Sequence, residues 1–188
     1  MPFTFRSLAI PDVQLIEPRV FRDERGWFLE SYKRSDFERA GIQGDFRQDN
    51  HSTSLPQGVL RGLHYQLPPN EQGKLVRVLA GSIFDVAVDL RPRSATYGKW
   101  VGETLRAQDF RMMWVPPGFG HGFCTLEPGT QVAYKTTAEY SAKDDRSIRW
   151  DDETLGIAWP VRAPVLSQKD RDAPSLLQAE AELRSRAP

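Results

Sequence analysis

Short apolar runs recur along the chain, and glycine, proline, asparagine or aspartate interrupts each of them within a few positions. Runs of roughly four to eight apolar or alternating residues bounded by such turn formers are typical of β-strands. The segment 83–90 is almost continuously apolar, with two aspartates of the same parity set into it, and 74–79 alternates before a turn at 80–82. This spacing predicts an all-β barrel or sandwich in a single domain, 1–188, without repeats or linkers.

The remaining elements follow from the same pattern. Further strands are predicted at 3–5, 13–16, 46–52, 58–66, 100–105, 112–115 and 131–137, a strand–turn–strand unit at 20–30 with Gly26 in its turn, and a tight turn feeding a strand at 116–123. Helical signals are few. A short helix is predicted at 35–40, with Ser35 as its N-cap and Gly41 as its stop, and a terminal helix lies in the tail 174–188. The stretch 151–160 reads as a loop.

The predicted strand 58–66 carries polar side chains inside an apolar run. An unpaired buried charge is very costly, so Arg61 and His64 require partners. By strand alternation His64 and Gln66 share one face, whereas Arg61 points to the other. If Arg61 and His64 reach one cavity, the strand must be irregular between them, and Gly62 is the residue that allows a bulge.

Composition narrows the possible functions. The formal net charge is zero, with 25 basic and 25 acidic residues, which removes the main argument for non-specific nucleic-acid binding. The single cysteine, Cys124, cannot form an intrachain disulfide and fits a reducing compartment. No apolar run approaches the roughly 20 residues of a membrane helix, and the first residues lack a signal-peptide stretch. We therefore expect a cytoplasmic protein that contacts neither membrane nor nucleic acid.

Seven runs in order carry a family resemblance: FRDERGWF at 21–28, QDNHS at 48–52, GVLRGLHYQ at 58–66, FDVAVDLR at 84–91, PPGFGHGF at 116–123, YKTT at 134–137 and LSQKD at 166–170. Over about residues 21–170 the chain resembles the dTDP-4-dehydrorhamnose 3,5-epimerases, nucleotide-sugar epimerases of the cupin superfold. The resemblance implies a double-sheet jelly-roll barrel and a homodimer with shared active sites. It also implies that an N-terminal strand crosses to the partner.

The reaction of that family defines the groups the site needs. The substrate is a dTDP-linked 4-keto-6-deoxyhexose, and the hydrogens inverted at C3 and C5 are both α to the ketone. Inversion requires a base, an acid on the opposite face and a group that stabilises the enolate, but no cofactor. By resemblance His64 is the base, Tyr134 the proton donor and Lys74 the enolate stabiliser. Asp170 matches the carboxylate that orients the base, and Asp85 is the alternative.

The resemblance also implies a set of substrate-binding positions. They are Arg25, Glu30, Gln48, Asn50, Arg61, His121, Tyr140, Asp145 and Lys169. Arginine and lysine suit a diphosphate, and Tyr140 would stack on thymine. Asp145 stands near a position where the family often has glutamate.

Three other functions are compatible with parts of the pattern. A metal-dependent cupin, such as an iron oxygenase, usually carries a His-x-His pair, but here Gln66 takes the second position, so no metal is expected. A 3- or 5-mono-epimerase would share most of the site, and the presence of Tyr134 favours double epimerisation. A non-catalytic binding module would need no base and acid pair.

Overall fold

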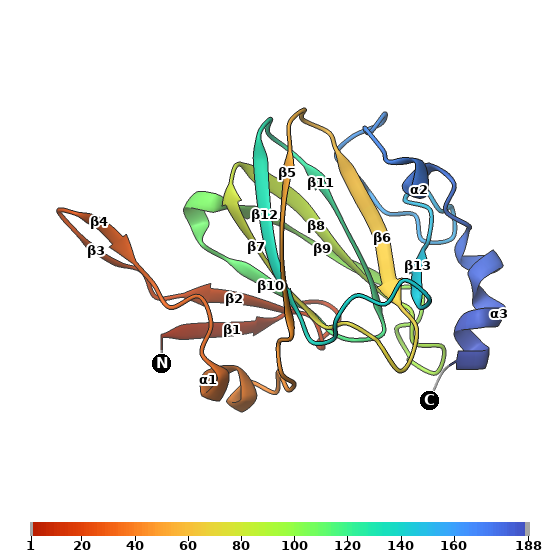
Figure 1. The fold of residues 1–188 in the computed structure, drawn as a ribbon, viewed down its shortest axis with the longest axis horizontal. Coiled ribbons are helices and arrows are strands. Elements are labelled where there is room, and N and C mark those ends of the chain that lie inside the picture. Colours follow the sequence, from red (N-terminus) through yellow and green to blue (C-terminus); the bar gives the residue numbers. More distant parts are fainter. Residues whose placement is uncertain (1, 187–188) are drawn as a thin grey trace.

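Two antiparallel sheets face each other in the computed structural model, which describes residues 2–186 (Figure 1). One sheet contains, in spatial order, β1 (Phe3–Ser7), β2 (Gln14–Pro18), β10 (Met112–Val115), β7 (Lys74–Ala80), β12 (Thr130–Thr136) and β5 (Gln48–Ser54). The other contains β13 (Asp145–Ser147), β6 (Leu60–Gln66), β11 (Phe119–Thr125), β8 (Ser82–Asp89) and β9 (Trp100–Arg106). This is the double-sheet jelly-roll barrel, and the predicted all-β fold is confirmed.

The interior of the barrel is filled from both sheets by alternate residues of each strand. Val76, Met113 and Val132 from one sheet belong to the same buried cluster as Ala87 and Phe123 from the other. The outer faces are covered separately. Helix α1 (Arg34–Arg39) packs over the first sheet through Phe37, and α3 (Leu176–Arg186) packs over the second. Strand alternation thus separates an inward set of side chains from two outward sets.

Strand β6 is irregular at the predicted position. Arg61 pairs with Phe123 and His64 with His121 on β11, and the register shifts between those two pairs. Phe123 and His121 share a face, so Arg61 and His64 point into the same interior although they lie three positions apart. Gly62 lies between them with φ +128°. The expected bulge is confirmed.

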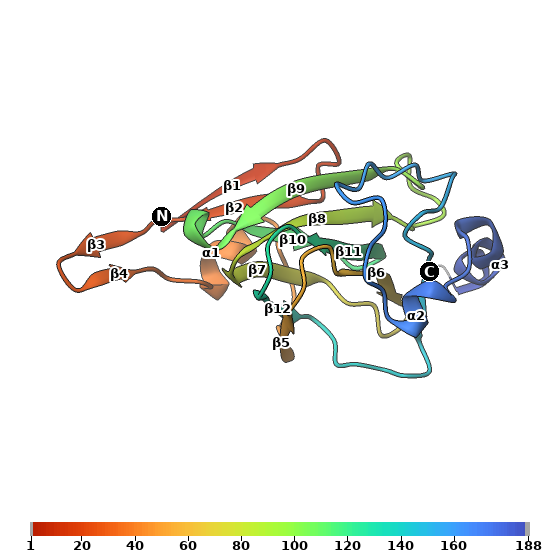
Figure 2. The ribbon, with the colours of Figure 1, turned by 90° about the horizontal axis from the view of Figure 1, so that it is seen from above.

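A two-stranded hairpin extends away from the barrel. It is formed by β3 (Phe21–Asp23) and β4 (Gly26–Phe28), and it lies at the opposite end of the molecule from α3 (Figure 2). Trp27 is 57% exposed and Phe28 66% exposed. Gly26, with φ +130°, is the first residue of β4 and follows the turn that it was expected to occupy.

The structure corrects the expected start of one helix and contains a further helix that was not predicted. The N-cap of α1 is Lys33, which has extended backbone angles, so the prediction of Ser35 as the cap was wrong and Ser35 lies within the first turn. Gly41, with φ +84°, follows the helix as expected. A second short helix, α2 (Gln168–Arg171), was not predicted.

The predicted terminal helix is present as α3, and Ala187 and Pro188 of the tail, like Met1 of the expected domain, lie outside the described residues. Between residues 2 and 186, no helix combines the length and apolar character that crossing a bilayer requires.

Candidate active site

A histidine–aspartate pair joins β6 to α2. His64 Nε2 lies 2.6 Å from Asp170 Oδ1, and Asp170 is 2% exposed whereas the His64 side chain is 31% exposed. Ser167 caps α2 and donates its hydroxyl to Asp170 Oδ2 over 2.7 Å. Burial raises the pKa of Asp170, but the hydrogen bonds from His64 and Ser167 outweigh it and leave the pKa below its ordinary value. The carboxylate therefore stays ionised, and Nδ1 is the ring nitrogen of His64 that Asp170 does not bind.

A second histidine–aspartate pair lies deeper in the barrel. His121 Nε2 is 2.7 Å from Asp85 Oδ1, and both side chains are buried. Burial lowers the pKa of His121 although Asp85 opposes the shift, so the imidazole is neutral at physiological pH. Of the two carboxylates proposed to orient His64, Asp170 contacts it and Asp85 contacts His121 instead.

Lys74 begins β7 and is 7% exposed. Its ammonium nitrogen donates to the backbone carbonyl oxygen of His64 over 3.2 Å, which places it beside the first histidine–aspartate pair. Burial lowers the pKa of Lys74 to about 8, with the charges of Asp145 and Asp85 opposing the shift. Lys74 is thus a buried amine beside His64 whose pKa lies near neutral pH.

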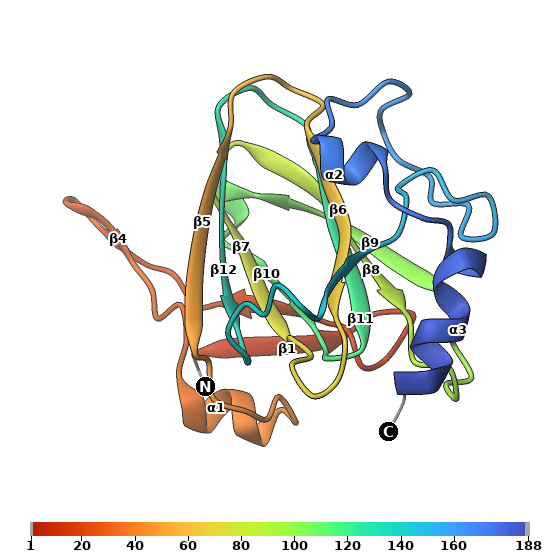
Figure 3. The same cartoon turned by 45° about the vertical axis from the view of Figure 1, so that its right-hand side comes forward.

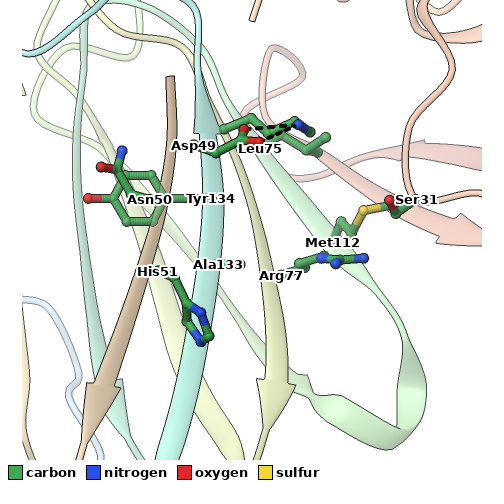
Figure 4. Close-up of a pocket in the computed structure, with 10 residues that line it drawn as sticks. Ser31, Asp49, Asn50, His51, Leu75, Arg77, Met112, Ala133 and Tyr134 are labelled. Carbon is green, nitrogen blue, oxygen red and sulfur yellow. Dashed lines mark hydrogen bonds and ion pairs between the residues drawn. The ribbon is translucent and has the colours of Figure 1, made fainter. Parts of the chain in front are cut away.

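Tyr134 reaches this interior from the opposite sheet. On β12 it pairs with Asn50 of β5 and Val76 of β7, and its ring packs against the inner cluster. In Figure 4 the side chains of Tyr134 and Asn50 extend to one side of these strands and those of Asp49 and Arg77 to the other, and residues of both sets line the pocket drawn there. Burial raises the pKa of Tyr134, and Arg61 opposes the shift, so the phenol remains protonated at neutral pH.

Several of the predicted binding residues form one hydrogen-bonded network. Gln48 donates to Asn50 Oδ1 over 2.9 Å and accepts from the backbone nitrogen of Tyr140 over 2.8 Å. The Tyr140 hydroxyl donates to Asp145 Oδ2 over 3.2 Å, and Lys169 Nζ donates to the same oxygen over 2.5 Å. Tyr140 is 60% exposed, so its ring face is open to a planar ligand.

Arg25 and Glu30 are not brought to this interior by their own chain. Arg25 lies in the turn of the projecting hairpin, where its side chain is 85% exposed and paired with Asp23. Glu30 follows the hairpin, and its buried Oε2 has no hydrogen-bond partner among the described residues. Arg61, by contrast, donates to the carbonyl oxygen of Thr53 on β5 over 3.2 Å and so bridges the two sheets.

Two features of the site were missed from the sequence. Ser167 three residues before Asp170 is a capping signature that indicates a helix start, and it holds the carboxylate of the first pair. The Asp85–His121 pair has no local signal, because its members meet only through the register of β8 and β11.

Gln66 occupies the position where a metal-binding cupin would place a second histidine. Its amide donates to the Glu139 carbonyl oxygen over 3.2 Å and accepts from the Ser141 backbone nitrogen over 2.7 Å, so it fastens the loop that carries Tyr140. Among residues 2–186 no group of three or more histidine, cysteine or acidic side chains has a metal-binding arrangement.

A jelly-roll barrel with an imidazole and a phenol facing its interior from opposite sheets, and a nucleotide-sized polar network beside them, defines a cupin-type sugar epimerase. The family model described as dTDP-4-dehydrorhamnose 3,5-epimerase matches residues 7–178, and the chain belongs to this family. It is 52% identical over 172 residues to the Shigella flexneri dTDP-4-dehydrorhamnose 3,5-epimerase, which covers 91% of this chain and 94% of that protein.

Solved structures agree with this assignment. The Bacillus anthracis dTDP-4-dehydrorhamnose 3,5-epimerase with TDP and PPi bound is 46% identical with a TM-score of 0.90, covering 92% of this chain and 99% of that one. The Legionella pneumophila dTDP-6-deoxy-D-glucose-3,5-epimerase in complex with dTDP-4-keto-L-rhamnose is 45% identical with a TM-score of 0.92, covering 96% of each chain.

Proposed function

We propose that this protein inverts C3 and C5 of dTDP-4-dehydro-6-deoxy-D-glucose and releases dTDP-4-dehydro-L-rhamnose. The observation that supports it most is the placement of His64 and Tyr134, which face one interior from the two opposing sheets. A sugar ring between them would meet a base on one face and an acid on the other.

His64 acts as the base. Nδ1 removes the hydrogen from C3 or C5 as a proton, and the ionised Asp170 stabilises the imidazolium that forms while holding the ring in one orientation. The buried position of Asp170 strengthens this interaction because little water screens it.

Lys74 stabilises the enolate. Removing an α-hydrogen places negative charge on the ketone oxygen, and a preorganised ammonium beside it lowers the barrier without reorganisation. Lys74 lies next to His64 and is desolvated, so the base and the group that stabilises the enolate are neighbours.

Tyr134 donates a different proton, its own phenolic one, from the opposite face. Its raised pKa keeps the hydroxyl protonated at neutral pH, as a proton donor requires. One proton leaves and another arrives at each carbon, so the reaction changes stereochemistry only, and no redox cofactor or metal is needed.

The polar network beside the interior holds the nucleotide. Tyr140 stacks on thymine, Gln48 and Asn50 offer hydrogen bonds to the base or sugar, and Arg61 and Lys169 neutralise the diphosphate. His121, neutral and backed by Asp85, offers a hydrogen bond to a sugar hydroxyl.

Arg25 and Glu30 complete the nucleotide site of a second copy in a homodimer. The supporting observations are the projecting hairpin with its exposed Trp27 and Phe28 and the unpartnered buried oxygen of Glu30. A hairpin that projects with exposed apolar side chains can bury them against a second copy, and in doing so it would carry Arg25 to that copy.

The test is proton NMR of dTDP-4-dehydro-6-deoxy-D-glucose incubated with the protein in heavy water without added metal. We expect deuterium at both C3 and C5 and accumulation of the L-sugar product. The His64→Ala variant should show no exchange at either carbon, whereas His51→Ala, on the outer face and bonded to Gln131, should behave as wild type. Exchange at one carbon only would indicate a mono-epimerase, and full exchange by His64→Ala would refute its role as the base.

A further inference from the structure

The C-terminal helix α3 lies on the side of the barrel formed by the sheet that contains β6, β8 and β9 (Figure 3). Leu176, Ala179 and Leu183 form one buried stripe that packs on the outer face of the sheet, against residues such as Tyr65 and Ile148. The apolar stripe fixes the helix in place but does not account for the charged residues at its edge.

One arginine joins this helix to the segment 138–146, which consists of a loop and the first two residues of β13. Arg146 donates from Nε and Nη2 to the two carboxylate oxygens of Glu182 on α3, over 2.9 and 2.7 Å. Its third nitrogen, Nη1, donates to the carbonyl oxygens of Lys143 and Asp145 over 2.9 and 3.0 Å. Because the guanidinium is planar and rigid, the position of Glu182 determines where these two carbonyls lie.

A second connection runs through the buried carboxylate of Asp144. Its Oδ2 accepts from Asn70 over 2.8 Å and from the Ser141 hydroxyl over 2.7 Å. Its Oδ1 accepts from Arg186 of α3 over 3.3 Å, and Arg186 also donates to the Pro68 carbonyl oxygen over 2.8 Å. Arg186, in the last turn of α3, therefore contacts two segments, one at Pro68 and the other at Asp144.

The residues fastened in this way are neighbours of the proposed nucleotide ligands. Asp144 precedes Asp145, whose side chain receives the Tyr140 hydroxyl and the Lys169 ammonium. The family model ends at residue 178, so it includes only the first three residues of α3, and neither Glu182 nor Arg186 lies within it.

We propose that α3 is a positioning element for nucleotide binding, in which Glu182 and Arg186 hold the segment 138–146 so that Tyr140 and Asp145 are in place before the nucleotide binds. This inference rests on the proposed function. A loop that is ordered before binding loses less entropy when the ligand arrives. The helix contacts Arg146 and Asp144, which flank the proposed ligand Asp145, so loss of these contacts should raise KM and leave kcat unchanged.

The test compares Glu182→Gln with Glu180→Gln. Both are Glu-to-Gln changes on the same helix, but Glu180 pairs only along α3 with Arg184, over 2.6 Å. Calorimetry with dTDP alone gives Kd, and NMR assays of the keto sugar give KM and kcat. We expect Glu182→Gln to raise Kd and KM together by about fivefold with kcat unchanged, the range of a partly exposed bidentate pair, and Glu180→Gln to match wild type.

Arg186→Ala serves as a second variant that acts through Asp144, and it should shift Kd in the same direction. Unchanged Kd in both variants, in a wild-type protein that turns over the keto sugar, would overturn the inference and leave the proposed function standing. A fall in kcat with unchanged KM would also overturn it. A wild-type protein that neither binds dTDP nor converts the sugar would overturn both.

Discussion

At the scale of single residues, burial and partner choice give the two histidines different properties. His64 is partly exposed, and its Nε2 is paired with the ionised carboxylate of Asp170. His121 is buried in the interior, its pKa is lowered, and it is suited to hydrogen bonding as a neutral ring. The same pair of residue types therefore lies in two different environments, which is consistent with the different roles proposed for the two histidines.

The pKa of Lys74 predicts the alkaline side of the pH profile. Below about pH 8 the amine is charged and can stabilise the enolate, and above that value it loses its proton. Because kcat/KM reports groups of the free enzyme, we expect it to fall above about pH 8, by about tenfold per pH unit. Lys74→Met should lower kcat/KM at pH 7 by about a hundredfold and remove this decline.

Lys135→Met is the matched control for Lys74. Lys135 follows Tyr134 on β12, so it points to the outer face, where it pairs with Asp49, and its loss should leave the decline in place. A wild-type profile of kcat/KM that stays flat well above pH 8 would contradict the assignment of Lys74.

Tyr134 is tested by removing its hydroxyl alone. In Tyr134→Phe the base and the enolate stabiliser remain, so we expect deuterium exchange to continue in part while net inversion slows by about a hundredfold. Tyr97→Phe is the control, because Tyr97 packs on the outer face near α3. Formation of the L-sugar at the wild-type rate by Tyr134→Phe would reject the donor assignment, and NMR measures both quantities.

At the scale of elements, the site depends on the close approach of β6 and β11. A Cβ added to Gly62 would lie 2.5 Å from Gly122 Cα and 2.8 Å from the His121 carbonyl oxygen, and φ is +128°. The two glycines let the strands come together at the bulge that turns Arg61 and His64 toward one interior. A side chain at this point would separate the strands and displace the base.

Gly62→Ala is therefore expected to lower the free energy of unfolding by about 3 kcal/mol or more, through backbone strain and overpacking together. Gly129→Ala is the control, because Gly129 also has positive φ but an added Cβ meets nothing within 4 Å, so it should cost only about 1 kcal/mol. Urea denaturation followed by circular dichroism measures both. Equal losses would show that strand contact at Gly62 contributes nothing.

At the scale of the whole molecule, the hairpin β3–β4 separates two proposed ligands from the rest of the site. Arg25 and Glu30 lie in the hairpin and the segment directly after it, whereas His64 and Tyr134 lie on barrel strands. If the proposed homodimer exchanges hairpins, each active site combines the barrel of one subunit with Arg25 of the other.

Subunit mixing tests this arrangement. Arg25→Ala and His64→Ala should each be inactive alone, but a mixed dimer contains one site built from two intact parts. After unfolding and refolding together in equal amounts, we expect about one quarter of wild-type activity. No recovery in the mixture, with mixed dimers verified by mass, would contradict the exchange.

Most strands, the bulge at Gly62 and the terminal helix were predictable from the sequence, because alternation, glycine and helix composition act over a few neighbouring residues, but the short strand β13 was missed. The roles of the site residues came from short motifs and remain predictions to be tested. The N-cap of α1 was misplaced, since backbone angles at Lys33 rather than the presence of a serine decide where the helix begins.

Only the tertiary structure decided which groups meet. His64 and Asp170 are 106 positions apart, and Asp85 and His121 are 36 apart, so their pairing depends on strand register and on where α2 docks. The same holds for Arg146 and Glu182, which join strand β13 to a helix that the chain reaches later. Local sequence determines which face a side chain takes along a strand, but contacts between distant segments depend on how the two sheets and the helices pack against each other.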